Sequence, residues 1–288
     1  HHHPNDTGNI KVAFFLNLLF TIIEIVGGLL TNSLAILSDA LHDLGDSLSL
    51  GLAWYFQKIS NKGRDSKYSY GYKRFSLLGA IVNSIVLIVG SIFIIKEAIP
   101  RVLNPETADA KGMILLAILG VIINGAAVLK LKKGESQNEK VVALHLLEDV
   151  LGWVAVLIGS IVIYFTDWFI IDPLLSLGIA LFILINVYRN LKTSLNIILQ
   201  AVPEGVEIKA IQAELIKVVG VDSIHDLHVW SLDGQKNVLT VHVVLEDENV
   251  NQHNVKVAIS KAMQRFKINH CTIETEIKGE ECAMGDCE

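Results

Sequence analysis

Six apolar segments of membrane-spanning length constrain the fold of this chain more than any other feature. A helix needs about 20 consecutive apolar residues to cross a bilayer, and the first two thirds of the sequence contain six such stretches. Their approximate bounds are 9–30, 33–57, 75–99, 111–130, 138–165 and 170–191. Hydrophobic residues make up 51% of the 288 residues, and the mean hydropathy is +0.47. We therefore expect an α-helical membrane protein with six transmembrane helices.

Positively charged residues indicate which loops face the cytoplasm. They gather in the second and fourth loops, whereas the loops "LLTNS" and "YFTDWF" contain none. The basic residues of the second and fourth loops are Lys58, Lys62, Arg64, Lys67, Lys73, Arg74, Lys130, Lys132, Lys133 and Lys140. Because Lys and Arg are enriched on the cytoplasmic side of a membrane, we expect both termini to be cytoplasmic. Pro100 and Pro173 are expected at the ends of their helices.

The sequence changes character near Val202. "PEGVEIKAIQAELIKVVG" has helical periodicity, and "SIHDLHVWSL" and "NVLTVHVVLE" alternate like strands on either side of a "DGQK" turn. A helix and a strand follow in "NVKVAISKAMQRF" and "HCTIETEI". This α-β-β-α-β order predicts a small α+β cytoplasmic domain, and an antiparallel sheet with helices on one face would accommodate it.

These changes in composition divide the chain into four parts. We expect an N-terminal cytoplasmic segment at residues 1–8 and a transmembrane domain of six helices at residues 9–200. A cytoplasmic domain for metal binding and dimerisation would occupy residues 201–278, and a cysteine-containing tail residues 279–288.

The second apolar segment carries four ionisable residues on one helical stripe. Asp39, His42, Asp43 and Asp46 lie at positions i, i+3, i+4 and i+7. Each charge at the centre of a membrane helix costs about 2.5–3.5 kcal/mol on insertion scales. A bound cation is one partner that would offset this cost.

The fifth segment repeats part of this pattern. His42 and Asp46 are four residues apart, and so are His145 and Asp149, so each pair shares one face of its helix. Two such helices packed face to face would present two imidazoles and two carboxylates to one point, a set suited to tetrahedral Zn²⁺. Ser136 and Glu139 form a capping box, which would place His145 roughly 13 Å along the helix, near mid-bilayer.

Simpler interpretations exist for several of these residues. A single His-x-x-x-Asp is more often a histidine hydrogen-bonded to an aspartate than a metal site, and only the two copies on apolar spans favour the metal. Asp39 and Asp43 could orient His42 or hold water around the metal. For Glu24 and Asp172, a structural hydrogen bond or a helix cap is at least as favoured as a role in transport. Asn83 and Asn124, in the third and fourth segments, could form hydrogen bonds between helices and nothing more.

Composition and missing motifs disfavour several function classes. The net charge of −6 gives no argument for nucleic-acid binding. A membrane zinc hydrolase is disfavoured because a catalytic zinc keeps an open position and no H-E-x-x-H motif occurs, so we expect no enzyme. No nucleotide-binding loop occurs either, which disfavours an ATP-driven pump. A membrane-bound metal sensor that signals through the cytoplasmic domain is the alternative to a transporter.

The motifs together resemble the cation diffusion facilitator family of zinc-transporting membrane proteins. The resemblance extends over "NSLAILSDALHDLGDS", "YGYKRFSLLGA", "HLLEDVLG", "DPLLSLGIAL" and "HDLHVWSL". It implies a homodimer, a metallochaperone-like cytoplasmic domain, and export of Zn²⁺ from the cytosol in exchange for protons by alternating access. Cd²⁺ and Co²⁺ stay open as further substrates. A prokaryotic plasma membrane fits the compact length of the chain.

The resemblance also implies roles for individual residues. His42, Asp46, His145 and Asp149 match the transport ligands of the family. In the cytoplasmic domain, the positions that match regulatory metal ligands are His225, His242, Glu276, His253, Cys282 and Cys287. In the second loop, Tyr68 and Tyr72 stand where some members carry histidines, with Asp65 upstream, so a metal site in that loop is not expected. Zn²⁺ is thus expected both as substrate and as a regulatory ligand.

Overall fold

The chain forms two compact units. The computed structural model describes residues 6–131 and 137–280, with side chains for all of these except 6–13, 16, 53, 54, 57, 130, 131 and 137–146. One unit comprises residues 1–56 and 79–191, and the other comprises residues 57–78 and 192–288.

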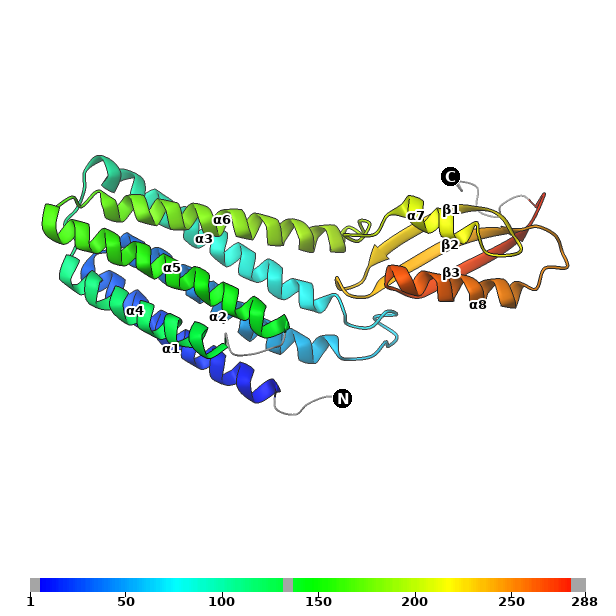
Figure 1. Ribbon diagram of the computed structural model, residues 1–288, viewed down its shortest axis with the longest axis horizontal. Coiled ribbons are helices and arrows are strands. Elements are labelled where there is room, and N and C mark those ends of the chain that lie inside the picture. The colour runs from blue at the N-terminus through cyan, green and yellow to red at the C-terminus, as the bar shows by residue number, and fades with distance from the viewer. Residues whose placement is uncertain (1–5, 132–136, 281–288) are drawn as a thin grey trace. The chain divides into compact units, whose positions relative to one another are not determined.

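Six long helices account for the first unit (Figure 1). They are α1 (Asp6–Thr31), α2 (Leu34–Ser60), α3 (Phe75–Leu103), α4 (Ala110–Leu131), α5 (Gln137–Thr166) and α6 (Ile171–Ile198). Four described stretches are long and apolar enough to cross a membrane, in α3, α4, α5 and α6. In α1 the described apolar stretch is the shorter Asn17–Thr31, and α2 has the length but carries the aspartate stripe. The predicted helical membrane protein is confirmed.

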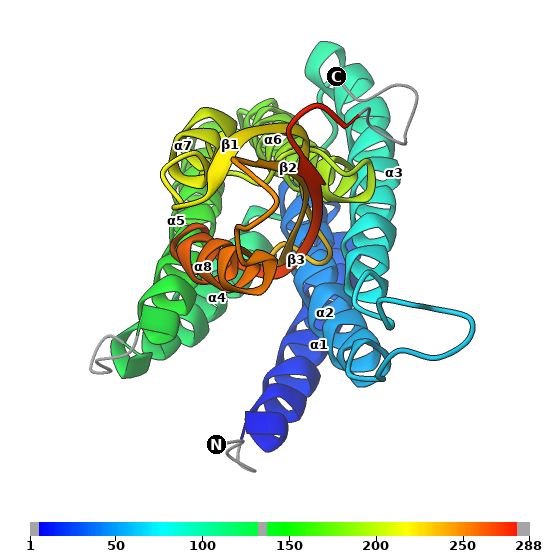
Figure 2. The same ribbon diagram turned by 90° about the vertical axis from the view of Figure 1, so that its right-hand side faces the viewer.

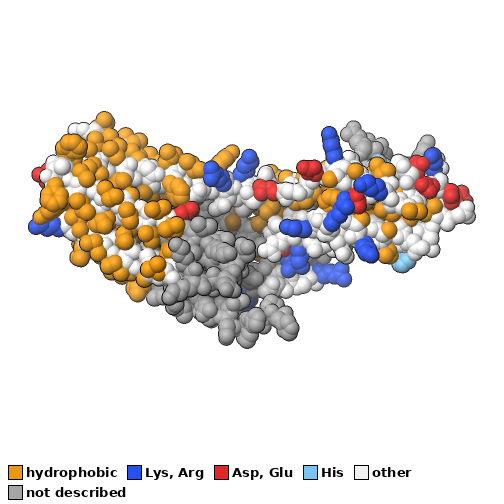
Figure 3. Space-filling model, viewed as in Figure 1, with side chains coloured by type: hydrophobic (Ala, Val, Ile, Leu, Met, Phe, Trp, Pro, Cys, Tyr) orange, Lys and Arg blue, Asp and Glu red, His pale blue; other side chains and the backbone are white. Residues whose placement is uncertain are grey.

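The outer surface of these helices is apolar. Hydrophobic side chains cover most of the face of the helices that is visible in Figure 3. Leu115 and Phe165 expose 71% and 77% of their surface, which would be unfavourable in water but suits contact with lipid. Polar contacts lie between helices instead. The predicted interhelical role of Asn83 is confirmed by its hydrogen bond to Ser49, at 2.7 Å. Asn124 has no hydrogen-bond partner for its Nδ2 among the described residues.

Two helix ends differ from the predictions. Pro100 does not end α3, which continues to Leu103, because a proline in the last turn forfeits only one backbone donor. Its carbonyl still accepts from the N–H of Asn104, at 2.9 Å. Likewise, α6 continues past Leu191 to Ile198, since the polar residues there end the apolar pattern without breaking the helix. Gln200, in a left-handed conformation with φ 59°, follows the end of α6.

The second unit contains the predicted α-β-β-α-β domain. Its elements are α7 (Ile208–Leu215), β1 (Val221–Ser231), β2 (Asn237–Leu245), α8 (Gln252–Met263), the short 3₁₀ helix η1 (Gln264–Phe266) and β3 (Ile268–Ile277). The sheet order is β1-β2-β3, and α7 and α8 lie on the same side of the sheet (Figure 2). The β1–β2 hairpin closes at Gly234, whose φ of 87° suits glycine.

The expected antiparallel sheet is only half right. β1 and β2 are antiparallel, but β3 runs parallel to β2. The reason is the connection: α8 carries the chain back along the sheet before β3 begins, as in any β-α-β unit. Alternation along β2 then separates two faces. Leu239, Val241 and Val243 pack against the helices, whereas His242 points to the opposite, helix-free face.

A close approach between α4 and α5 gives a test of this packing. Trp153 is 1% exposed, and a Cβ at Gly120 would lie 2.3 Å from its ring. Because the indole is large and buried, we expect Gly120→Ala to destabilise the protein by about 1–3 kcal/mol. Gly125→Ala, on the same helix, meets nothing within 4 Å and should be neutral. Unfolding in detergent titrated with SDS measures both, and equal stabilities would contradict this packing.

Candidate metal centres

Three of the four predicted transport ligands converge on one point between α2 and α5. Nε2 of His42 lies 3.6 Å from Oδ1 of Asp149 and 3.9 Å from Oδ2 of Asp46. The possible ligand atoms of these three residues all lie within 4.8 Å of one another. One imidazole and two carboxylates in this arrangement could bind a divalent cation, and one further ligand would complete a tetrahedral site.

The cluster borders a cavity with largely apolar walls. A cavity of about 280 Å³ is bordered by His42, Asp149, Gly152 and Phe182, and the His42 ring meets Phe182 of α6 edge-on at 6.4 Å. Asp149 is 9% exposed, and its Oδ1 accepts no hydrogen bond of good geometry from the described residues, since His42 Nε2 lies 3.6 Å away. A buried carboxylate oxygen with such a weak partner is costly, and a bound cation would satisfy it.

His145 is the fourth predicted transport ligand. It lies in α5, one helical turn before Asp149, but its side chain is outside the described residues. The same holds for the side chains of the capping box, Ser136 and Glu139. The membership of His145 in the site therefore stays a prediction from its spacing.

Asp172 anchors the start of α2. Its carboxylate accepts hydrogen bonds from the backbone N–H groups of Leu34 and Ala35 at 2.8 and 3.1 Å, and from the Ser33 hydroxyl at 2.5 Å. This is an N-cap supplied by another helix, at the positive end of the α2 dipole. The structural interpretation of Asp172 from the sequence is confirmed, and the contact fixes the position of the helix that carries His42.

Three further carboxylates lie in the same helix interfaces. Asp39 and Asp43 are each 5% exposed and Glu24 only 1%, and Asp39 fits against Gly152 of α5. The Glu24 carboxylate lies close to Asp43, although neither of its oxygens makes a hydrogen bond of good geometry within the described residues. The sequence had not singled out Glu24 for this cluster, because contact between α1 and α2 is not visible in either segment alone.

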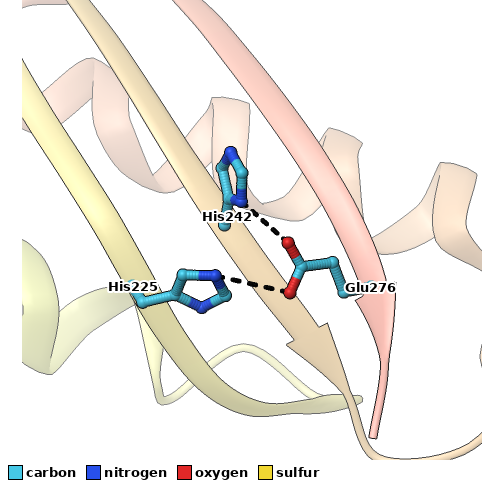
Figure 4. Close-up of side chains that lie close together, drawn as sticks. All are labelled: His225, His242 and Glu276. Carbon is cyan, nitrogen blue, oxygen red and sulfur yellow. Dashed lines mark hydrogen bonds and ion pairs between the residues drawn. The ribbon is translucent and has the colours of Figure 1, made fainter. Parts of the chain in front are cut away.

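A second cluster lies on the helix-free face of the sheet, where His225, His242 and Glu276 converge (Figure 4). Nδ1 of His242 lies 2.7 Å from Oε1 of Glu276, and Nε2 of His225 lies 3.4 Å from Oε2. The two imidazole centroids are 5.0 Å apart. Nε2 of His225 is buried without a well-aligned hydrogen bond among the described residues. Two nitrogens and a carboxylate within 4.8 Å of one another suit Zn²⁺.

An irregularity in β1 helps to form this second cluster. The register between β1 and β2 shifts between His225 and His228, and Asp226 adopts a φ of 48°, which is a β-bulge. His225 thereby stands directly opposite His242. Oδ2 of Asp226 and Oε2 of Glu274 lie 3.7 and 3.5 Å from Nε2 of His242. These two acids were missed by the sequence analysis, which could not locate the bulge.

The remaining predicted cytoplasmic ligands are not brought to this cluster. His253 is exposed on α8, and α8 packs against the opposite face of the sheet. Cys282 and Cys287 lie outside the described residues. Within the described part of the chain, the cluster therefore consists of strand residues alone.

A helical membrane unit with a buried carboxylate–imidazole cluster, joined to an α+β domain with a second one, defines a membrane protein that handles metal cations. Residues 10–199 match the family described as "Cation efflux transmembrane domain". Residues 203–278 match "Cation efflux protein, cytoplasmic domain". The chain belongs to this cation efflux family, also called the cation diffusion facilitators, as the sequence motifs predict. The family is one of membrane transporters.

Several bacterial relatives match nearly the whole chain. The "Metal cation efflux system protein CzcD" of Cupriavidus metallidurans is 38% identical, over 96% of this chain and 90% of the relative. The "Cadmium, cobalt and zinc/H(+)-K(+) antiporter" of Bacillus subtilis is 35% identical, over 96% and 91%. The "Zinc transporter ZitB" of Shigella flexneri is 32% identical, over 99% and 92%.

Removal of the cap on α2 should weaken the membrane unit. We expect Asp172→Ala to cost about 2–4 kcal/mol, because three hydrogen bonds to a buried carboxylate are lost together. Glu106→Ala, which removes an exposed carboxylate 3.1 Å from Arg101, should cost less than about 1 kcal/mol. SDS-induced unfolding followed by circular dichroism compares the two, and a smaller loss for Asp172→Ala would contradict the cap.

The cytoplasmic cluster predicts which histidine is needed for zinc binding. In full-length protein carrying Asp46→Ala and Asp149→Ala, only the cytoplasmic site should remain. His242→Ala should then weaken zinc binding by about tenfold or more, since one of three ligands is lost. His253→Ala should leave the affinity unchanged. Competition with a zinc-chelating dye measures both, and equal losses would show that the site has other ligands than the strand cluster.

Proposed function

We propose that this protein exports Zn²⁺ from the cytosol in exchange for protons. The transport site would be His42, Asp46, His145 and Asp149. The observation that carries this proposal is the convergence of His42, Asp46 and Asp149, from two helices, on one point inside an apolar bundle. His145 shares a face of α5 with Asp149 by its i, i+4 spacing and would complete a tetrahedral set.

Protons and metal compete for the same atoms in this site. Zn²⁺ requires neutral imidazoles and ionised carboxylates, so protonation of the ligands releases the metal, and histidine titrates near physiological pH. In an alternating-access cycle, the site would load Zn²⁺ while open to the cytosol. Protons from the other side would then displace the metal and travel back inward. Exchange follows from the chemistry of the ligands without a separate proton channel.

The ligand set also supports a choice of metal. Two imidazoles favour Zn²⁺ over Mg²⁺ or Mn²⁺, which prefer oxygen ligands. Cd²⁺ and Co²⁺ remain candidate substrates, in line with the name of the Bacillus subtilis relative.

The cytoplasmic cluster would bind zinc as a regulator. Two imidazoles and Glu276 supply its ligands, and the carboxylates of Asp226 and Glu274 add negative charge around His242. Zinc bound there would tighten a homodimer through the cytoplasmic domains and raise activity when cytosolic zinc is high. When bound, the metal would link β1, β2 and β3.

The setting of the protein follows from the distribution of charge and from its relatives. Both termini would lie in the cytosol, since the basic loops 58–74 and 130–140 face that side by the positive-inside rule. The host membrane would be a bacterial plasma membrane, as the matched relatives are bacterial. The division at about residue 200 would separate the transmembrane domain from the cytoplasmic one.

Zinc flux into proteoliposomes with an imposed pH gradient tests the proposal. In wild type, the flux should follow the direction of the gradient. Asp46→Ala and Asp149→Ala should each reduce it to the level of protein-free vesicles, because the site loses a charged ligand. Asp167→Asn, at an exposed position between α5 and α6, should leave the flux unchanged.

Two outcomes would overturn parts of the proposal. Flux that persists in Asp149→Ala would remove this residue from the transport site. Zinc binding without flux in the wild type would favour the alternative, a membrane-bound sensor that signals through its cytoplasmic domain.

A further inference from the structure

The loop between α2 and α3 is the most basic segment of the described chain. It connects two helices that end or begin at Ser60 and Phe75, so both of its ends are held at the surface of the membrane. Between residues 58 and 74 it carries six basic residues and one acidic residue, Asp65. The transport site does not use any of them.

Internal contacts hold this loop in one shape. Asp65 accepts hydrogen bonds from the backbone N–H groups of Tyr68 and Lys67, at 2.8 and 2.9 Å, and from the Tyr72 hydroxyl at 2.8 Å. The Tyr68 and Tyr72 rings pack against each other with centroids 4.5 Å apart. Asp65 therefore serves as a structural acceptor, and no cation is needed to explain its position.

Gly71 closes the same loop. Its φ is 77°, and a Cβ there would lie 3.2 Å from the carbonyl oxygen of Lys62 and 3.3 Å from the amide nitrogen of Arg64. The chain thus folds back tightly on itself, in a conformation that suits glycine. A loop held in this way presents its outward side chains in a fixed arrangement.

Those outward side chains are positively charged. Lys58, Lys62, Arg64 and Lys67 are exposed, and within the described residues none of the four forms an ion pair with a carboxylate. Asp65 is the one carboxylate of the loop, and it accepts three hydrogen bonds from within the loop, so the loop keeps a large excess of positive charge. The donors from Tyr68, Tyr72 and Lys67 lower the pKa of Asp65, so this carboxylate stays ionised but internally bound.

We propose that the loop from Lys58 to Arg74 is a binding surface for the headgroups of anionic lipids. Basic clusters next to a membrane helix attract anionic lipids, by on the order of fivefold in affinity for each Lys or Arg near the surface. Here the cluster is attached to two membrane helices and is shaped in advance, which lowers the entropy lost on binding. The partner is a phosphodiester headgroup such as that of phosphatidylglycerol.

Contact with the cytoplasmic domain gives this surface a further consequence. The Tyr70 ring meets His270 of β3 edge-on, with centroids 5.9 Å apart. A lipid bound by the loop would therefore restrain β3, at one edge of the sheet that carries His225, His242 and Glu276. This lipid-binding proposal rests on the proposed function only in the choice of leaflet. The positive-inside rule assigns the loop to the cytoplasmic side of the membrane.

Lipid titration of the full-length protein in dodecyl maltoside micelles tests the proposal. The probes are dihexanoyl phosphatidylglycerol and dihexanoyl phosphatidylcholine, with binding followed by isothermal titration calorimetry. Wild type should bind the anionic lipid at least tenfold more tightly than the zwitterionic one. This preference should weaken as salt is added, since the charges are exposed.

Two triple variants separate the loop from the overall charge. Lys62→Gln, Arg64→Gln and Lys67→Gln together should abolish the preference for phosphatidylglycerol. Lys209→Gln, Lys236→Gln and Lys261→Gln remove the same charge from exposed positions of the cytoplasmic domain and should retain it. Circular dichroism and gel filtration in detergent report that each variant is folded.

Several results of these titrations would overturn the lipid-binding proposal. Equal binding of the two lipids by wild type, or equal loss in both variants, would overturn the proposal. Binding of sn-glycerol 3-phosphate as tight as that of the lipid would also overturn it, since the loop would then recognise free phosphate. The titration requires no zinc flux, so its failure would leave the proposed transport function untouched.

Discussion

The cost of placing charged groups among membrane helices is the constraint on which this structure depends. The interfaces of α2 with its neighbours contain six carboxylates and one imidazole, from Glu24, Asp39, His42, Asp43, Asp46, Asp149 and Asp172. Within the described residues, Asp172 accepts hydrogen bonds from two backbone N–H groups and one hydroxyl. The others meet one another or His42. In an apolar medium, such an arrangement is tolerable only when protons or metal ions occupy it. The stability of the bundle and its chemistry are therefore linked.

The two clusters solve the problem of bringing ligands together in different ways. In the membrane unit, α-helical periodicity places candidate ligands one turn apart, and the packing of α2 against α5 brings the residues of the two helices together. In the cytoplasmic domain, the candidate ligands come from three strands, and their approach depends on the register of those strands. A bulge at Asp226 aligns His225 with His242, and the parallel pairing of β3 brings Glu276 to the same face. In the cytoplasmic cluster, a register error of one residue would turn a strand side chain to the other face of the sheet.

This contrast explains what could be predicted from the sequence. The helices, the pairs His42–Asp46 and His145–Asp149, and the α-β-β-α-β order follow from periodicity, which a single segment contains. The contacts of Asp172 with Ser33, Leu34 and Ala35 join residues about 138 positions apart and follow from tertiary packing. The parallel pairing of β3, the position of Asp226 beside His242 and the position of Glu24 beside Asp43 also follow from contacts between distant segments. Pro100 shows that a local signal can also mislead. Proline was expected to end the helix, but α3 continues to Leu103 because only its last turn remained.

The central position of His242 has a consequence for how a new chain matures. Its strand lies between β1 and β3, so the cluster of His225, His242 and Glu276 is complete only when β3 has joined the sheet. The candidate ligands of the membrane cluster are all synthesised by residue 149. During translation a chain would thus contain these groups well before those of the cytoplasmic cluster. A protein truncated before β3 would keep the first set and lack Glu276, and the order of the elements along the chain is also an order of assembly.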